Sequence, residues 1–394
     1  MSQKKKSLKY AAKHQKRWFG KWHTWGGITA GFVLIIVCLT GSLLVFEEEL
    51  DVWLNPELFT FSEGKERITF QETLEAIQIQ RPEWEVGGIF VGEKREGAMM
   101  AFLKTTPVYQ VVIDPYNGKV MGSRVYANTL MGTIRRLHRT LLIPTIGKYI
   151  VGISSIFMAI LVITGLRLWI PSKWRFLKDH LGIKSKASFK RQNYDFHRAM
   201  GFYFSPFITL ISLTGAAITF SPLIILALFL VSFEPPQSLS SILNQKSSYV
   251  EGQNTLSITE IEALSMKAMP EGEVMGISFP RDTAGVYTVN IIEESVSETG
   301  SRYLLFVDQY SGEVVTNSKT DFPNIGNAYV NWVTPIHYGT FGGLPTRILA
   351  LIASFMGALM FLSGILIWWP RWKKQQGKKG AGPVRTERKL EKVH

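Results

Sequence analysis

The sequence predicts an all-α transmembrane four-helix bundle, built as two parallel repeats, that carries two extracytoplasmic α+β modules. Three observations lead to this fold class. The 394-residue chain contains four long apolar runs, four of its histidines recur at matched intervals, and its Lys and Arg residues are concentrated in three segments. Together these features indicate two copies of one membrane-spanning plan.

The four apolar runs predict four transmembrane helices. A helix that crosses a hydrocarbon core of about 30 Å needs about 20 apolar residues, and each run is long enough. The predicted spans are 24–46, 148–170, 199–221 and 346–369. The first is expected to stay as an anchor, because it lacks the small-residue cleavage site of a signal peptide. A further apolar stretch, from Pro222 to Phe233, is too short to span and is expected to lie in the membrane interface.

The basic residues predict how the spans are oriented. Segment 1–23 holds eight Lys or Arg and no acidic residue, segment 171–198 holds eight against two acidic residues, and segment 370–394 holds nine against two. By the positive-inside rule, both termini and the middle loop are cytoplasmic. The segments 47–147 and 222–345 then lie outside. Insertion into a lipid bilayer accounts for the net charge of +13, so no nucleic-acid partner is expected.

The positions of four histidines indicate an internal duplication. One interval from a histidine to a later glycine occurs twice, in His23–Gly41 and His197–Gly215, and a longer interval also occurs twice, in His138–Gly165 and His337–Gly364. The shorter interval makes about five helical turns, so on a continuous helix its two residues share one face. Both halves start and end inside, which predicts parallel repeats related by an axis along the membrane normal. Equivalent histidines then lie at equal depth.

This symmetry predicts two b-type haems. His23 and His197 would face each other near the cytoplasmic side, and His138 and His337 near the outer side. Each pair is expected to give two axial ligands to one haem iron, which favours electron transfer because no coordination position stays open. The chain has a single cysteine, Cys38, and no C-x-x-C-H motif, which excludes covalent c-type haem. The alternative is that these histidines only anchor the span ends.

Four neighbouring residues are secondary candidates for contacts with the haems. Arg139 and Arg198 directly follow two of the histidines and are candidates to pair with haem propionates. Gly41 and Gly215 are candidates to let a flat macrocycle approach the backbone. Both assignments have ordinary alternatives, since basic residues are common beside span ends and small residues pack helices together in lipid.

The two outer segments also repeat each other. Each begins with a predicted helix that ends at a proline, Pro82 or Pro270. Alternating apolar residues, typical of strands, follow in both segments. Each segment then closes with a turn, 114–120 or 308–314, in which Asn-Gly or Ser-Gly supplies a positive φ. The segments are therefore predicted to be two small α+β modules of similar topology.

These motifs carry a resemblance to a known family. The helix and the D-x-Y-x-G-x-V turn resemble the PepSY module, and the four-span frame with its histidines and T-G pairs resembles the PepSY-associated transmembrane family. The resemblance covers nearly the whole chain except its two basic tails. That family includes iron-uptake-associated inner-membrane proteins and ferric-siderophore reductases.

The resemblance implies a multi-pass protein of the bacterial inner membrane that reduces a ferric siderophore or a similar iron chelate on the periplasmic side. Reduction to Fe(II) weakens binding by hard oxygen ligands and releases the metal. The sequence contains no recognisable nucleotide-binding motif, so the electron donor is expected to be a separate cytoplasmic-side protein or a quinol. Two alternatives remain: a non-enzymatic envelope protein whose PepSY modules bind or regulate peptidases, and a permease for haem or an iron chelate.

Overall fold

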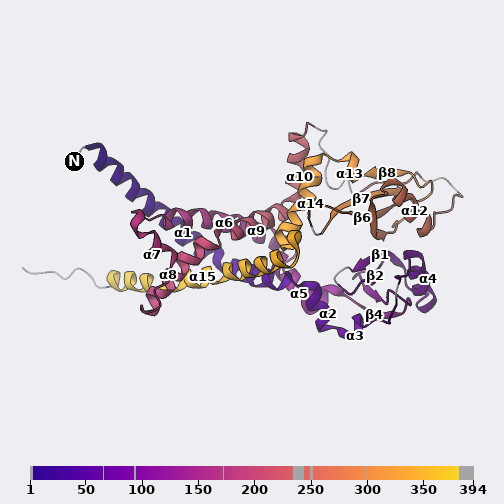
Figure 1. Cartoon of the computed structure of the whole chain (residues 1–394), viewed down its shortest axis with the longest axis horizontal. Helices are drawn as coiled ribbons and strands as arrows, with labels where there is room; N and C mark the ends of the chain where they lie inside the picture. The colour runs from indigo at the N-terminus through magenta and orange to yellow at the C-terminus, as the bar shows by residue number, and fades with distance from the viewer. Residues whose placement is uncertain are drawn as a thin grey trace, which may run out of the picture.

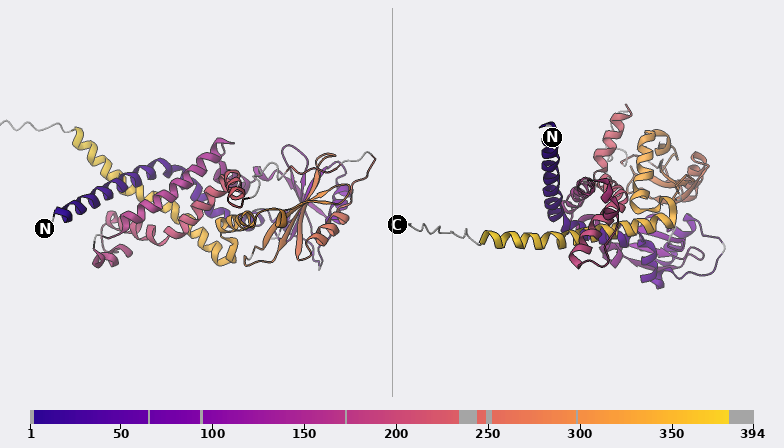
Figure 2. Two further views of the ribbon diagram at one scale, coloured as in Figure 1. Left: turned by 90° about the horizontal axis from the view of Figure 1, so that it is seen from above. Right: turned by 60° about the vertical axis from the view of Figure 1, so that its left-hand side comes forward.

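The computed structural model describes residues 3–64, 66–92, 95–171, 173–233, 244–248, 252–297 and 299–380. The molecule is elongated, with long helices at one end and a β-sheet at the other (Figure 1). The N-terminal end of α1 (Gln3–Leu44) and the C-terminal end of α15 (Gly343–Gly380) both lie at the end away from the sheet (Figure 2). The basic segments of the sequence are therefore separated from the sheet by the apolar part of the helices.

The apolar helices pack together in a helical region made of α1, α6 (Ile146–Trp169), α8 (Phe189–Tyr203), α9 (Ser205–Thr219) and α15. Within the described residues, α1, α6 and α15 are each long and apolar enough to cross a membrane, and α8 with α9 forms a bent pair that counts as a fourth crossing if it is one span. Helices α1 and α15 extend beyond the predicted spans into the basic segments.

The third predicted span, 199–221, is not one straight helix. The chain bends by 64° between α8 and α9. Pro206 explains the break, because its ring lacks an N–H and clashes with the carbonyl of the residue four positions earlier. The Ser205 hydroxyl instead donates to the Phe202 carbonyl oxygen at 2.7 Å. The expectation that His197 and Gly215 share one face of a continuous helix is therefore wrong.

Apolar side chains from α1, α6, α9 and α15 meet in the middle of the helical region. Leu34 from α1, Ile208 from α9 and Phe361 from α15 are buried there together with Met158 from α6. Burying side chains of this size contributes about 1.5–3 kcal/mol each where water is the alternative environment. In lipid the gain comes instead from close van der Waals packing. This apolar core separates the two ends of the helical region.

Shorter helices connect the helical region to the sheet and close its basic end. The apolar stretch after α9 forms α10 (Ser221–Val231), an 11-residue helix that is too short to span. Two helices, α5 (Leu130–Thr140) and α14 (Asn324–Tyr338), carry His138 and His337. Other short helices are α2 (Glu47–Leu54), α3 (Pro56–Phe59), α7 (Leu177–Leu181) and α13 (Ser318–Asp321), with 3-10 turns η1 (Tyr126–Asn128), η2 (Trp174–Phe176) and η3 (Thr340–Gly342).

The two outer segments share a single eight-stranded antiparallel sheet, to which each segment contributes four strands. Its strand order is β4-β3-β2-β1-β5-β6-β7-β8, so β1 and β5 join the two halves. This joint pairs the first strand of each half and leaves neither as an open edge. The strands are β1 (Val86–Gly92), β2 (Ala98–Leu103), β3 (Gln110–Ile113), β4 (Val120–Arg124), β5 (Gly272–Ser278), β6 (Val286–Glu293), β7 (Ser301–Asp308) and β8 (Val314–Asn317).

The predicted helices of the outer segments are α4 (Phe70–Gln80) and α12 (Ile258–Ala268). Each begins with a capping box. The Thr69 or Ser257 side chain accepts the backbone N–H of the glutamate three residues later, and that glutamate's carboxylate accepts the backbone N–H of Thr69 or Ser257. Ile77 and Ile261, one from each helix, are fully buried in one apolar core with strand residues from both halves. The two halves therefore stabilise each other.

The two predicted turns are also present, and each is organised by a buried aspartate. Gly118 and Gly312 have φ angles of 71° and 73°, as the sequence predicted. Asp114 accepts the backbone N–H groups of Ser62 at 2.8 Å and Tyr116 at 2.9 Å. Asp308 accepts those of Ser248 at 2.6 Å and Tyr310 at 2.8 Å. Burial raises the pKa of each carboxyl, but these hydrogen bonds outweigh it and lower both pKa values below the ordinary 3.8.

We expect the stability of the sheet to fall in acid because of these two aspartates. Lowered folded-state pKa values give stability that is complete above pH 3.8 and is lost as the pH falls below it. The variant Asp114→Asn/Asp308→Asn should be about 1–3 kcal/mol less stable than wild type at about pH 6, with a flatter acid limb in denaturant titrations followed by circular dichroism. Asp282→Asn, at an exposed site, is the control. Equal acid limbs in wild type and double variant would contradict this role.

Candidate functional site

The structure brings His23 and His197 together near the basic end of the helical region. Their ring centres lie 6.2 Å apart and the ring planes are 80° from parallel. The Nδ1 atom of His23 lies 3.1 Å from the Leu161 carbonyl oxygen, and that of His197 lies 2.9 Å from the Ser363 hydroxyl. Because a carbonyl oxygen only accepts, Nδ1 of His23 carries the proton and its Nε2 keeps a free lone pair.

His138 and His337 form a second pair at the end of the helical region nearer the sheet. Their ring centres lie 6.3 Å apart, with 48° between the ring planes. His138 donates from Nδ1 to the Val37 carbonyl oxygen at 2.9 Å, and His337 donates from Nδ1 to the Ile211 carbonyl oxygen at 3.0 Å. Nε2 is therefore the free nitrogen in both rings. The pairing by depth that the sequence predicted is the pairing that the structure has.

All four histidines are seated by the same device, a hydroxyl residue followed by glycine on another helix. Each Nδ1 lies within 3.2 Å of the hydroxyl, and a Cβ placed on each glycine would lie 2.9–3.4 Å from the imidazole Cε1. The four seats are Thr164-Gly165 for His23, Thr40-Gly41 for His138, Thr214-Gly215 for His337 and Ser363-Gly364 for His197. The glycines thus give the imidazoles room to approach the backbone.

In the structure each histidine contacts a different glycine from the one that follows it at the repeated interval in the sequence. Gly41 lies on the same helix as His23, yet it contacts His138. Gly165 follows His138 in the chain, yet it contacts His23. Sequence reasoning therefore missed the orienting role of Thr164 and Ser363. The signal for it was present, because a hydroxyl residue precedes the glycine in every one of the four intervals.

Both pairs have the spacing of two imidazoles that share one metal ion. Imidazole nitrogen binds a first-row metal at about 2.0 Å, and about 1.1 Å separates that nitrogen from its ring centre, so two rings on one metal lie about 6.2 Å apart. Among the described residues, no group of three or more His, Cys, Asp or Glu is placed to hold a metal ion. The chain thus offers two nitrogen ligands per site, and the other ligands of a six-coordinate metal would have to come from a bound group.

A cavity of about 1550 Å³ surrounds the His23–His197 pair. Sites for one small ligand or cofactor are typically about 300–1,000 Å³, so the cavity is large enough for a macrocycle. Basic residues dominate the charged part of its lining: Lys16, Arg17, Lys21, Arg191, Arg198 and Arg371, against Asp179. The cavity therefore favours an anionic or partly anionic ligand.

The two predicted arginine contacts have different environments. Arg198 is largely buried; it pairs with Asp195 at 3.0 Å and also donates to the Asp179 carbonyl oxygen. Its Nε lines up with no acceptor. Arg139 lies on α5 beside His138 and is exposed. Arg198 is thus part of the cavity around the first pair, whereas Arg139 belongs to the outer surface near the second.

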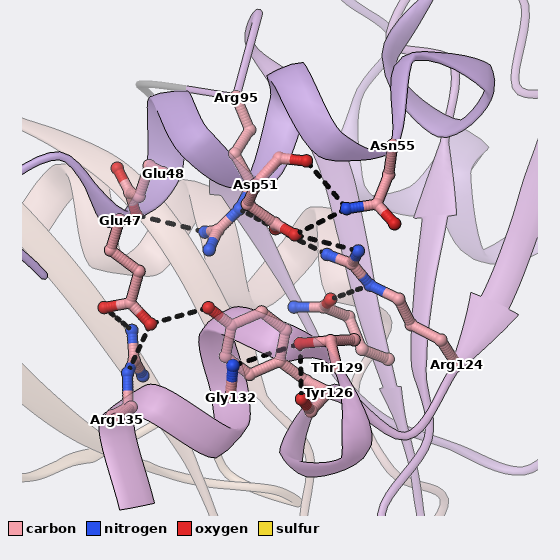
Figure 3. Close-up of polar contacts among 11 residues, drawn as sticks. Glu47, Glu48, Asp51, Asn55, Arg95, Arg124, Tyr126, Thr129, Gly132 and Arg135 are labelled. Carbon is pink, nitrogen blue, oxygen red and sulfur yellow. Dashed lines mark hydrogen bonds and ion pairs between the residues drawn. The ribbon is translucent and has the colours of Figure 1, made fainter. Parts of the chain in front are cut away.

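A charged contact fixes the helix that carries His138. Arg135, three residues before His138 on α5, donates from Nε and Nη2 to the Glu47 carboxylate at 2.7 and 2.6 Å (Figure 3). The Tyr126 hydroxyl donates to the same carboxylate at 2.6 Å. This two-pronged geometry is the strong form of an ion pair. It ties α5 to α2, which continues the first apolar helix, and so holds His138 toward its seat.

A second, fully buried charge lies beside this contact. Asp51 has no exposed surface and accepts two hydrogen bonds from Arg124, at 2.9 and 2.6 Å, and one from Arg95 at 3.1 Å (Figure 3). Arg124 belongs to β4 and Arg95 to the β1–β2 connection, so Asp51 joins the end of the helical region to the first half of the sheet. A buried carboxylate with these partners holds the two parts in one orientation.

The two histidine pairs lie at different depths with apolar side chains between them. His23 and Gly41, which contacts His138, lie on one unbroken helix and are separated along its axis by about 27 Å. That distance is close to the thickness of a hydrocarbon core. One pair therefore lies near each end of the apolar helices.

These features define a membrane protein with several apolar helices, a histidine pair near each end of them and a sheet domain at one end. The chain belongs to the family of PepSY-associated transmembrane regions, which residues 21–371 match. This span of the chain includes all four paired histidines, their seats and the whole sheet. No curated protein matches the sequence.

Proposed function

We propose that the protein is a four-span, b-type di-haem electron-transfer protein, with one haem held by His23 and His197 (the inner haem) and one by His138 and His337 (the outer haem). The observation that carries the proposal is the spacing of the rings, 6.2 and 6.3 Å, in two pairs whose Nδ1 atoms all have partners. A b-type haem held by two imidazoles supplies one-electron transfer through its Fe(III)/Fe(II) couple.

The residues of the chain fit this group in three respects. Nδ1 hydrogen bonds fix each imidazole and leave Nε2 as the ligand atom, as in other histidine metal sites. The large, basic cavity at the first pair suits a macrocycle with carboxylate side chains. The apolar core around Leu34 and Phe361 keeps water away from the path between the two pairs.

The charge distribution supports an orientation with both termini in the cytoplasm and the sheet outside, in the inner membrane of a bacterium. The basic ends of α1 and α15 and the loop with α7 lie together at the end opposite the sheet (Figure 1). The positive-inside rule assigns that end to the cytoplasm. Electrons would enter at the inner pair from a separate protein or a quinol and leave at the outer pair.

We further propose that the acceptor is a ferric siderophore or a similar iron chelate, which gains one electron and releases Fe(II) because hard oxygen ligands hold it less tightly. The resemblance of the sequence motifs to a family that includes ferric-siderophore reductases implies this substrate class. Exposed Arg136 and Arg139 flank His138 on the outer side of α5 and suit an anionic chelate. The sheet, which would comprise two PepSY modules, would form the docking surface beyond them.

An absorption spectrum of the purified protein, oxidised and then reduced with dithionite, tests the proposal. We expect two haems per chain, sharp reduced α-bands of six-coordinate iron, and haem that acid–acetone extracts because no cysteine binds it covalently. Oxidation of the reduced protein by a ferric chelate, followed at the α-band, tests the acceptor. A protein purified without haem would exclude this function and favour a non-enzymatic role for the sheet. Uptake of intact chelate without iron reduction would favour a permease.

A further inference from the structure

Two buried hydrogen-bond donors in the described part of the chain have no acceptor, Trp169 Nε1 and Arg198 Nε. Both residues line the cavity around His23 and His197. Buried polar groups are nearly always paired, since leaving one unpaired costs about 1–3 kcal/mol. Two unpaired donors in one cavity indicate that its ligand brings acceptors to this place.

Neither donor can turn away to find another partner. The Trp169 ring stacks on Phe202, with ring centres 3.9 Å apart and planes within 9°, which fixes the direction of its N–H. His180 donates from Nδ1 to the Trp169 carbonyl oxygen at 2.7 Å and holds the backbone at the end of α6. The Nη2 atom of Arg198 donates both to the Asp195 carboxylate and to the Asp179 carbonyl oxygen, which fixes the guanidinium. Both N–H groups are thus held in place before any ligand binds.

The two donors lie on the side of the histidine pair that faces the basic end. Trp169 follows Gly165, the glycine that contacts His23, by about one helical turn toward the end of α6. Arg198 directly follows His197, and side chains on a helix lean toward its N-terminus, which for α8 is the basic end. The site thus contains one uncharged donor, the Trp169 indole, and one charged donor, Arg198. The charge of Arg198 is already paired with the buried Asp195.

We propose that Trp169 Nε1 and Arg198 Nε bind a carboxylate of the inner haem and direct its propionate edge toward the basic end. This inference rests on the proposed function. Both groups only donate, and the basic lining of the cavity favours an anionic oxygen acceptor. The propionates are the anionic acceptors that a b-type haem carries. Trp169 adds a contact that neither composition nor spacing indicated.

The repeat provides a matched control for Trp169, because the equivalent residue in the second half of the chain has no such unpaired donor. Trp368 is the equivalent of Trp169 in the second half, at the same offset that separates His337 from His138. It lines the same cavity, but its Nε1 is not among the buried atoms without a partner. Trp169→Phe removes the N–H and keeps an aromatic ring against Phe202, and Trp368→Phe makes the same change at the equivalent position.

The test measures the rate at which haem leaves the protein for an excess of a haem-scavenging protein, with haem b and with its dimethyl ester, which lacks the carboxylates. We expect Trp169→Phe to release haem b about tenfold or more faster than wild type, because the variant loses one hydrogen bond to a charged group. With the dimethyl ester, wild type and Trp169→Phe should release at the same rate. Trp368→Phe, whose indole N–H is not among the buried donors without a partner, should change the release rates of both haems by the same factor.

A rate for Trp169→Phe that rises equally with both haems would show that the indole acts by packing and would overturn the subsite. An unchanged rate with haem b would do so as well. Arg198→Lys, which keeps the cation and removes the Nε donor, gives a second measurement with the same expected pattern if Trp169→Phe fails to accumulate. The outcomes are separable from failure of the proposed function, because both variants should retain the two-histidine spectrum, whereas a wild-type protein without haem would refute the function itself.

Discussion

Replacing His197 or His23 with alanine should remove one of the two haems, and replacing both should remove little more. In the proposed arrangement each histidine pair would share one iron, so the loss of either ligand would already abolish the six-coordinate site. The same result is expected for His138 and His337, whereas a variant with one change in each pair should lose both haem signals. The pyridine haemochrome content should therefore fall from two haems per chain to about one in a single variant and to about one when both histidines of one pair are changed. It should fall to about zero when one histidine of each pair is changed.

The outer pair should matter most for reduction of a soluble chelate. His138→Ala should lower the rate of chelate reduction at least about tenfold while leaving the inner haem reducible, because electrons would reach the inner site but have no second site near the acceptor. His14→Ala is the control, since His14 is exposed and lines the cavity around the other histidine pair, His23 and His197. If His138→Ala and His337→Ala altered different haems, ligation across the two halves would be refuted.

The second large effect is expected at Asp51. Asp51→Ala should destabilise the protein by about 3–5 kcal/mol, because it leaves the largely buried Arg124 without a carboxylate and Arg95 with only its pair to Glu48. Denaturant unfolding in detergent, followed by far-ultraviolet circular dichroism of the sheet, measures this change. Glu57→Ala, at an exposed position on the neighbouring helix α3, should change the stability by less than about 0.5 kcal/mol.

The Asp51 variant also separates stability from function. At a temperature where it remains folded, it should keep the inner haem, whose ligands lie at the far end of the helices. A change of stability below about 1 kcal/mol would contradict the view that this carboxylate joins the helices to the sheet. Loss of the inner haem in the folded variant would contradict the independence of the two sites.

Features of this protein that depend on local chemistry were determined by the sequence alone. The apolar runs predicted four spans, and three of them fall on the long apolar helices α1, α6 and α15, because hydropathy and length decide whether a helix suits a membrane; the run 199–221 falls on the bent pair. The turns at Asp114 and Asp308 were predicted because their glycines need a positive φ. The pairing of the four histidines followed from repetition within the sequence. Their binding of haem stays a prediction.

What only the tertiary structure decided involves contacts between residues far apart in the chain. Pro206 in the sequence is a local cause of the bend before α9, but the 64° angle depends on how α8 and α9 pack on their neighbours. The seats of the histidines come from other helices, such as Thr164 for His23, 141 residues away. The joint between β1 and β5 and the unpaired donor of Trp169 arise in the same way. Spacing along a chain records which residues share an element, whereas the partners across elements are selected by packing of the whole fold.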